Sequence, residues 1–202
     1  MPDLTDSGLI LRSVSEALRG LIRRNVTELQ AESAVVFDSP GEIESHDETK
    51  LSLYLYQTEV NAYMRNLPAR ITRQAAAAPA PAALETIAAP LVVDLTYLLV
   101  PYARSAELEL VLVDKLMQLF HDVGQLSGEW LTPTLKRTGN EQIQIIPEFD
   151  SSERLRNIWS GFPHRSYKLT KLYTLSPVRI PSRFATRSEL VVQADADYRV
   201  GP

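Results

Sequence analysis

The stretch PLVVDLTYLLVPYA, residues 90–103, constrains the fold more than any other part of the chain. It mixes Val, Leu and Thr, carries apolar residues at odd and even positions alike, and is bounded by Pro90 and Pro101. A run of this length is too short to span a membrane and is typical of a central strand that is buried on both faces. Its single acid, Asp94, must reach a rim or a partner, because an unpaired buried carboxylate is costly.

Three segments show the spacing of helices. In residues 8–28 and 105–121 apolar side chains recur every three or four positions, and the wide stripe of the second segment predicts a helix that packs on the sheet. Residues 151–162 begin with serines, one of which can cap a short helix that contains Trp159.

Strands are expected in several other segments. Residues 51–60 alternate between leucines and a face with two tyrosines, which predicts a strand whose second face is covered only in part. Residues 167–180 alternate in the same way, and Pro177 and Pro181 favour an edge position, since proline lacks the donor that a central ladder needs. Two shorter strands are expected, one in AVVFDSPGE and one at 142–149.

These elements predict an α/β (α+β) fold, a mixed sheet of about four to six strands packed by two or three helices. Residues 67–89, rich in Ala and Pro, have little to bury and predict an inserted loop between two strands. We expect one domain over residues 1–181 and a C-terminal arm over 182–202. The predicted core contains Leu53, Leu55, Leu95, Leu98, Leu112, Leu116 and Trp159.

The net charge of −4 hides two segregated tracts. Residues 28–59 hold eight acids against Lys50, a net charge of −7, whereas residues 165–188 hold six bases and no acid. Two interpretations stay open: both tracts are solvated faces, or the basic tract of one copy meets the acidic tract of the next. The second interpretation makes a set of charged residues candidates for contacts with other subunits: Arg165, Lys168, Lys171, Arg179, Arg183, Arg187, Glu42, Glu44, Asp47 and Glu48.

The residues that catalysis usually needs do not occur in recognisable patterns. The chain has no cysteine, and its histidines, His46, His121 and His164, are far apart and lack the spacing of metal ligands. No nucleophile elbow, P-loop or dinucleotide-binding motif is present. We therefore expect no enzyme, no metal and no cofactor. The N-terminus has no signal-peptide pattern, so the protein is expected to be made in the cytoplasm.

Aromatic residues among the bases of 165–188, such as Tyr167, Tyr173 and Phe184, keep nucleic-acid binding as a minor alternative. The aromatics also fit the alternation of a strand, and the chain as a whole is acidic, so we expect no nucleic acid as partner.

Four segments in order carry a resemblance to a known family: LSLYLYQTEVNAYMRN, PLVVDLTYLLVPYA, KLMQLFHD and ERLRNIWSGF followed by a basic strand. Together they resemble the N-terminal domain of the tail-terminator, or cap, proteins of extracellular contractile injection systems. Two departures are the Ala/Pro insertion after MRN and the segment beyond Ile180, which matches nothing in the family pattern.

The resemblance implies an α/β subunit that forms a hexameric ring on the end of a contractile tail. Such a ring closes the last layer of inner tube and outer sheath and stops their polymerisation. It implies tube and sheath proteins as partners, no cofactor and no catalysis, and assembly in the bacterial cytoplasm as part of a phage-tail-like particle. The alternatives are another structural part of the same particle, such as a baseplate or tube-end adaptor, and a cytoplasmic enzyme of unknown type.

Overall fold

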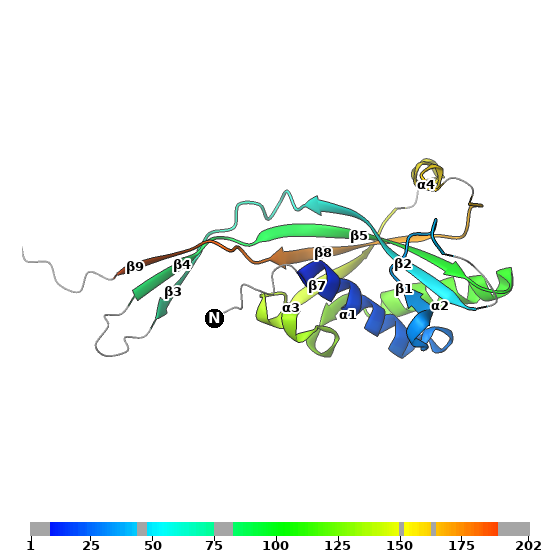
Figure 1. Cartoon of the computed structure of the whole chain (residues 1–202), viewed down its shortest axis with the longest axis horizontal. Helices are drawn as coiled ribbons and strands as arrows, with labels where there is room; N and C mark the ends of the chain where they lie inside the picture. Colours follow the sequence, from blue (N-terminus) through cyan, green and yellow to red (C-terminus); the bar gives the residue numbers. More distant parts are fainter. Residues whose placement is uncertain (1–8, 44–47, 75–82, 150–151, 163–164, 190–202) are drawn as a thin grey trace, which may run out of the picture.

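The computed structural model describes residues 9–43, 48–74, 83–149, 152–162 and 165–189 (Figure 1). Within them the chain forms a six-stranded sheet, ordered β1-β2-β5-β8-β7-β6, and a three-stranded sheet, ordered β3-β4-β9. Only β1 and β2 pair in parallel; the other neighbours are antiparallel. The mixed α+β fold expected from the sequence is thus confirmed.

The bounds of the elements are as follows. The six-stranded sheet consists of β1 (Val35–Val36), β2 (Lys50–Val60), β5 (Leu91–Tyr102), β6 (Gln125–Ser127), β7 (Gln142–Pro147) and β8 (Lys171–Ile180). The three-stranded sheet consists of β3 (Arg70–Gln74), β4 (Ala83–Ile87) and β9 (Ala185–Glu189). The helices are α1 (Ile10–Asn25), α2 (Ala106–Asp122), α3 (Pro133–Arg137) and α4 (Ser152–Ser160), with short 3-10 turns at Thr27–Leu29, Glu32–Ala34 and Gly128–Trp130. No helix in the described ranges has both the length and the apolar character that a membrane span requires.

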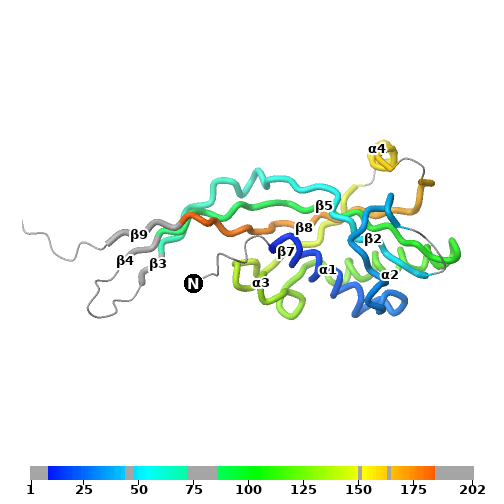
Figure 2. Tube along the Cα trace, in the orientation of Figure 1, coloured from blue at the N-terminus to red at the C-terminus, as the bar shows by residue number. Residues whose placement is uncertain are grey.

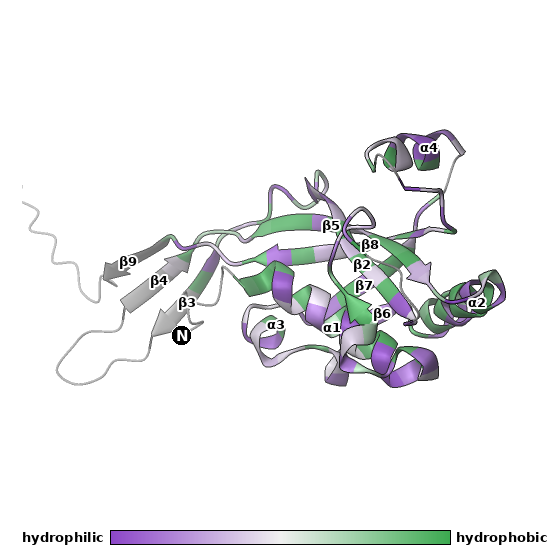
Figure 3. Cartoon of the chain, turned by 45° about the vertical axis from the view of Figure 1, so that its right-hand side comes forward, coloured by the Kyte–Doolittle hydropathy of each residue, from purple (hydrophilic) through white to green (hydrophobic). Residues whose placement is uncertain are grey.

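Helices cover both faces of the six-stranded sheet. Helices α1, α2 and α3 lie on one face and α4 lies on the other (Figure 1). In β5 the odd-numbered residues Val93–Leu99 belong to the core shared with α1, α2 and α3, whereas Leu98, Val100 and Tyr102 belong to the core shared with α4. The prediction of a central strand buried on both faces is confirmed, and the apolar colouring of β5 in Figure 3 shows the same pattern.

The residues predicted for the core divide between these two clusters. The larger one, under α1 and α2, includes Leu53, Leu95, Leu112 and Leu116, whereas the smaller one, under α4, includes Leu98 and Trp159. Leu55 is half-buried and packs against the larger cluster. It lies next to a β-bulge between Leu55 and Gln57, beyond which β2 becomes exposed.

Helix α1 is anchored to the central strand by a buried polar pair as well as by apolar contact. The Tyr97 hydroxyl lies 2.8 Å from Ser15 Oγ, and Ser15 Oγ donates to the carbonyl oxygen of Leu11 at 3.1 Å. Because the Ser15 hydroxyl has one proton, Tyr97 is the donor in the first bond. Burial raises the pKa of Tyr97 to about 12, against the opposing effect of the Ser15 hydrogen bond.

The prediction that the strand of residues 167–180 lies at an edge is wrong. Strand β8 lies between β5 and β7, and Pro177 is accommodated by a bulge. Val93 pairs with Val178 and Leu95 with Leu175, so Ser176 and Pro177 together stand opposite Asp94, and the β7 ladder reaches only to Ser176. Neither ladder therefore needs a donor from this proline.

Asp94 finds the partners that the sequence required. Asn61 Nδ2 donates to its carboxylate at 3.0 Å, and the Ser176 hydroxyl at the bulge donates to it as well. The carboxylate thus joins the end of β2, the middle of β5 and the bulge of β8.

The Ala/Pro segment and the C-terminal arm both contain strands, where the sequence predicted a loop at 67–89 and, beyond 181, an arm that is not part of the core. Strands β3 and β4 form an antiparallel pair within 67–89, and β9 pairs with β4. We call these three strands, residues 70–74, 83–87 and 185–189, the β-wing. The sequence did not reveal it because backbone ladders need no apolar side chains, and the partner strands are about 100 residues apart in sequence.

The β-wing continues the two central strands of the body. Strand β4 leads into β5 and β8 leads into β9, so the antiparallel pair β5–β8 is prolonged as β4–β9. Across the junction the Ala88 N–H donates to the Phe184 carbonyl at 3.2 Å. Figure 2 shows β2, β5 and β8 running side by side toward the wing, which projects from one end of the molecule in Figure 1.

We expect Tyr97→Phe to lower the free energy of unfolding by about 1 kcal/mol at neutral pH, because one buried hydrogen bond is lost. The pKa of Tyr97 is about 12 in the folded chain, against an ordinary value of 10.0. The contribution of the neutral Tyr97 side chain to the free energy of unfolding is therefore complete below pH 10 and is lost as the pH rises toward 12. The difference between wild type and variant in urea unfolding should therefore shrink over that interval.

The matched control is Tyr63→Phe, at a side chain that is 99% exposed. It should change neither the free energy of unfolding nor its pH dependence. A Tyr97→Phe difference that stays constant up to pH 12 would contradict the role given to burial.

Candidate assembly surfaces

The acidic and basic tracts meet within one copy at the turn of residues 39–42. The Arg165 guanidinium donates from Nη2 and Nε to the Gly41 carbonyl oxygen, at 2.9 and 3.2 Å. Gly41 lies in the turn before Glu42, and Glu42 accepts a bond from the Ser39 N–H at 3.3 Å. The beginning of the basic tract is therefore bound to the turn of the acidic tract in the same chain.

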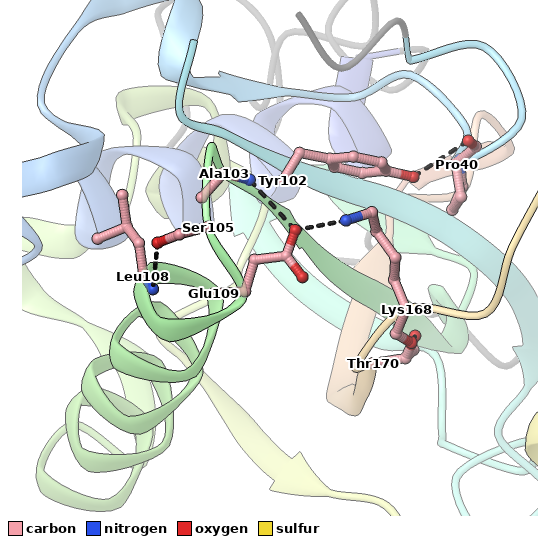
Figure 4. Close-up of polar contacts among 8 residues, drawn as sticks. All are labelled: Pro40, Tyr102, Ala103, Ser105, Leu108, Glu109, Lys168 and Thr170. Carbon is pink, nitrogen blue, oxygen red and sulfur yellow. Dashed lines mark hydrogen bonds and ion pairs between the residues drawn. The ribbon is translucent and has the colours of Figure 1, made fainter. Parts of the chain in front are cut away.

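Lys168 is bound inside the body. Its ammonium pairs with Glu109 Oε1 on the first turn of α2 and lies 5.3 Å from the centre of the Tyr102 ring (Figure 4). The same carboxylate oxygen accepts the Ala103 N–H at 3.3 Å. The side chains of Lys168 and Glu109 are 28% and 14% exposed, so this cation is a structural contact rather than a free surface charge.

Tyr102 and Trp159 complete this cluster. The Tyr102 hydroxyl donates to the Pro40 carbonyl at 3.1 Å (Figure 4). Burial raises the pKa of Tyr102, Arg165 opposes this and Glu109 adds to it. Trp159 Nε1 donates to Thr170 Oγ1 at 3.1 Å, which links α4 to the segment before β8. We call Tyr102, Glu109, Arg165, Lys168 and Thr170 the clamp, because they bind residues 165–170 to α2, α4 and the 39–41 turn.

Arg179 and Arg183, two other predicted interface charges, lie nearer the wing. The backbone of Arg179 is fixed by Asn140, which accepts its N–H at 2.7 Å and donates to its carbonyl at 2.9 Å. Arg183 is exposed and follows the end of β8. The side chain of Lys171, at the start of β8, is half-buried, and that of Arg187 lies outside the description.

The acidic tract is partly neutralised within the chain. Glu48 is exposed and pairs with Lys50 at 3.2 Å. Glu28 pairs with Lys115 of α2 at 2.5 Å, and the hydrogen bond from this lysine is the main cause that lowers the pKa of Glu28. Glu44 and Asp47 lie outside the described residues.

Helix α4 borders an open groove. The groove has a volume of about 520 Å³, and Leu155, Trp159 and Tyr167 supply most of its apolar wall. The rings of Trp159 and Tyr167 lie 5.6 Å apart, and Tyr54 of β2 contacts Phe162 edge to face. The second face of β2 is thus covered in part, as its two tyrosines predicted.

One of the three histidines lies in the described part of the chain. His121 is exposed at the end of α2, and His46 and His164 lie outside the described residues. In the described part of the chain no group of three or more His, Asp or Glu side chains has the geometry to hold a metal ion.

Residues 13–194 match the profile of the Pvc16 N-terminal domain. The chain belongs to this family. The matched range includes both sheets, the clamp and the β-wing.

Two solved structures share the fold of this Pvc16 N-terminal domain. One is a sheath/tube terminator of the PVC extracellular contractile injection system in its extended state, with a TM-score of 0.66 and 17% identity over 94% of this chain. The other is the tube-terminating cap of the anti-feeding prophage, with a TM-score of 0.58 and 16% identity over 93% of this chain. The chain spans only 63% and 60% of the lengths of those two proteins. The comparison with curated proteins finds no match.

Sequence reasoning identified Lys168 and Arg165 as candidates but not the residues that bind them. Glu109 appeared only as one of two acids on a helix, and its position two residues after Glu107 gave no sign of a partner 59 residues away. Tyr102 offered a weak signal, because a tyrosine at the end of a buried strand needs a partner for its hydroxyl.

In this Pvc16 N-terminal domain we expect Lys168→Met to lower the free energy of unfolding by about 1 kcal/mol, since the pair with Glu109 is partly exposed. Glu109→Gln should cost a similar amount, and the double variant less than the sum of the two. The measurement is a double-mutant cycle by chemical unfolding.

The matched control is Arg104→Gln, at an exposed position two residues before α2. It should change stability by less than about 0.5 kcal/mol. Additive effects of the Lys168 and Glu109 variants would show that the clamp pair contributes nothing.

Proposed function

We propose that this chain is a structural terminator of a contractile injection system, which binds the last layer of tube and sheath. The observation that carries the proposal is the match of 94% of the chain to a sheath/tube terminator. The proposal assigns the protein no catalytic role, in keeping with a chain that has no cysteine and scattered histidines.

The proposed form is a ring of six copies, as in the resemblance that the sequence suggested. Tube and sheath grow because each layer exposes a surface that binds the next copy. A terminator must bind that surface and offer no equivalent one. Side-by-side contacts between different patches achieve this when they close into a ring, because no free patch then remains to continue the polymer.

The charged tracts are proposed to guide the contacts of the terminator with its neighbours. Opposite charges raise the rate of encounter and fix orientation more than they add affinity. Exposed pairs contribute only about 0–1 kcal/mol each, so apolar contacts must supply most of the binding free energy. The candidates are the exposed Glu42, Glu48 and Arg183 and the half-buried Arg179, with Glu44, Asp47 and Arg187 as further candidates. The particle is proposed to assemble in the bacterial cytoplasm.

Deletion of the gene from a cell that makes the particle should give tails of uncontrolled length. The reason is that the growing ends of tube and sheath then stay open to further copies. The measurement is the distribution of tail lengths in negative-stain electron micrographs, with the wild-type gene supplied in trans as the control. Tails of normal, uniform length after deletion would refute termination by this protein.

A label on the protein should be found at one end of intact particles, opposite the baseplate. This position separates a terminator from the alternative of a baseplate or tube-end adaptor elsewhere in the particle. Localisation by cryo-electron microscopy at the baseplate end would favour the adaptor.

A further inference from the structure

The β-wing has no helix layer on either face among the described residues. No described residue of the wing belongs to either hydrophobic core, and its strands make their main contacts with one another. A small sheet is stable in water only when one face is covered. The projecting position of the wing in Figure 1 therefore suggests that its cover comes from another molecule.

One face of the wing carries two large exposed apolar side chains. Ile71 pairs with Thr86, so these two side chains point to the same face, and Thr86 pairs in turn with Thr186 of β9. Phe184 precedes Thr186 by two residues and bonds Ala88 through its backbone, which places it on that face as well. Ile71 is 65% exposed and Phe184 is 82% exposed.

Helix α2 has a second apolar stripe that faces away from the body. Its inner stripe packs in the core through Leu112, Leu116 and Phe120. The outward stripe contains Leu110, Val111 and Met117, which are 61%, 39% and 47% exposed. A surface helix normally presents polar residues there, so this stripe is a second place where a covering layer is missing.

The two uncovered surfaces cannot meet within one copy. Helix α2 lies at the end of the molecule opposite the wing in both Figure 1 and Figure 3. Their charges are opposite: residues 65–90 and 179–189 hold six arginines and two glutamates, a net charge of +4, whereas residues 106–122 hold four acids and one lysine, a net charge of −3.

We propose that the β-wing of one copy docks on the outward stripe of α2 of the next copy. Ile71 and Phe184 then pack against Leu110 and Met117, which completes a helix-on-sheet layer between two chains. The opposite net charges of the two regions, +4 around the wing and −3 on α2, favour this pairing, and Asp114 is exposed between Leu110 and Met117. The two patches differ, so the contact is heterologous and repeats from copy to copy. The inference rests on the proposed function in that it supplies the side-by-side contact of the ring.

The absence of cysteine allows a direct test by disulfide cross-linking in cells that make the particle. Two differently tagged copies are produced together, one with Ile71→Cys and the other with Met117→Cys, and the cells are treated with a mild oxidant. A mixed dimer that carries both tags is expected, at least ten times more abundant than in the matched control. A single chain with both substitutions should give a ladder of higher oligomers.

The control pairs Ile71→Cys with Phe149→Cys, at a side chain that is 85% exposed and follows β7, outside the outward stripe of α2. Phe184→Cys with Leu110→Cys repeats the test with independent positions, and circular dichroism of each variant checks that it folds. Mixed dimers no more abundant than in the control, or cross-links of Ile71→Cys to a sheath or tube protein instead, would overturn the proposal. Normal location of this protein at particle ends together with a failed cross-link would reject the wing contact and leave the terminator function intact.

Discussion

The rest of the structure depends on one antiparallel ladder, the pairing of β5 with β8. In the body both faces of this pair are covered, by α1, α2 and α3 on one side and by α4 on the other. Beyond Leu91 and Ile180 the two segments of the chain that form this pair continue as β4 and β9, where no helix covers the described residues. The antiparallel pair is thus buried in the core where it is formed by β5 and β8, and it projects without a cover where it is formed by β4 and β9. The body supplies the stability that holds the projection in place, because a small sheet without a covering layer is only marginally stable by itself.

Side-chain pattern predicted the body and failed at the wing, for a physical reason. Burial selects apolar residues at regular spacing, so the leucines of β2 and β5 and the stripe of α2 were readable from the sequence. In the wing the stabilising contacts are backbone hydrogen bonds, which leave no such pattern. Its prolines gave the only hint: Pro68 and Pro90 both lie just outside β3 and β4, where no ladder donor is required.

The edge prediction for β8 failed because a bulge opposite Asp94 removes Pro177 from both ladders, and a bulge depends on the partner strand. Of the candidate site, the charge segregation was predictable, but the partners of Lys168 and Arg165 were not, since they come from distant segments.

The basic tract is one segment in the sequence, but its two parts lie at different places in the structure. Its first part, from Arg165 to Lys168, is bound to Gly41 and Glu109 and supports the fold beneath α4. Its last part, from Arg179 onward, runs into the wing, where Arg183 is exposed at the junction. The ten residues of β8 separate the two parts. The net charge of a segment therefore does not tell which of its charges lie together on the surface, because a strand carries its two ends far apart.

The junction between body and wing determines what assembly the wing contact can build. A heterologous contact closes into a ring only if the rotation from one copy to the next divides a full turn; otherwise it continues as a helix. That rotation depends on the direction in which the wing leaves the body. Two prolines restrict the backbone angle φ at the junction between body and wing: Pro90 before β5 and Pro181 after β8. The hydrogen bond from Ala88 to Phe184 keeps the two connecting segments in register there. Both constraints act on the backbone and leave the wing side chains free to vary. The direction of the wing decides whether the copies form a closed ring or a helix. It is set by residues at the junction, which are different from the wing residues that contact the next copy.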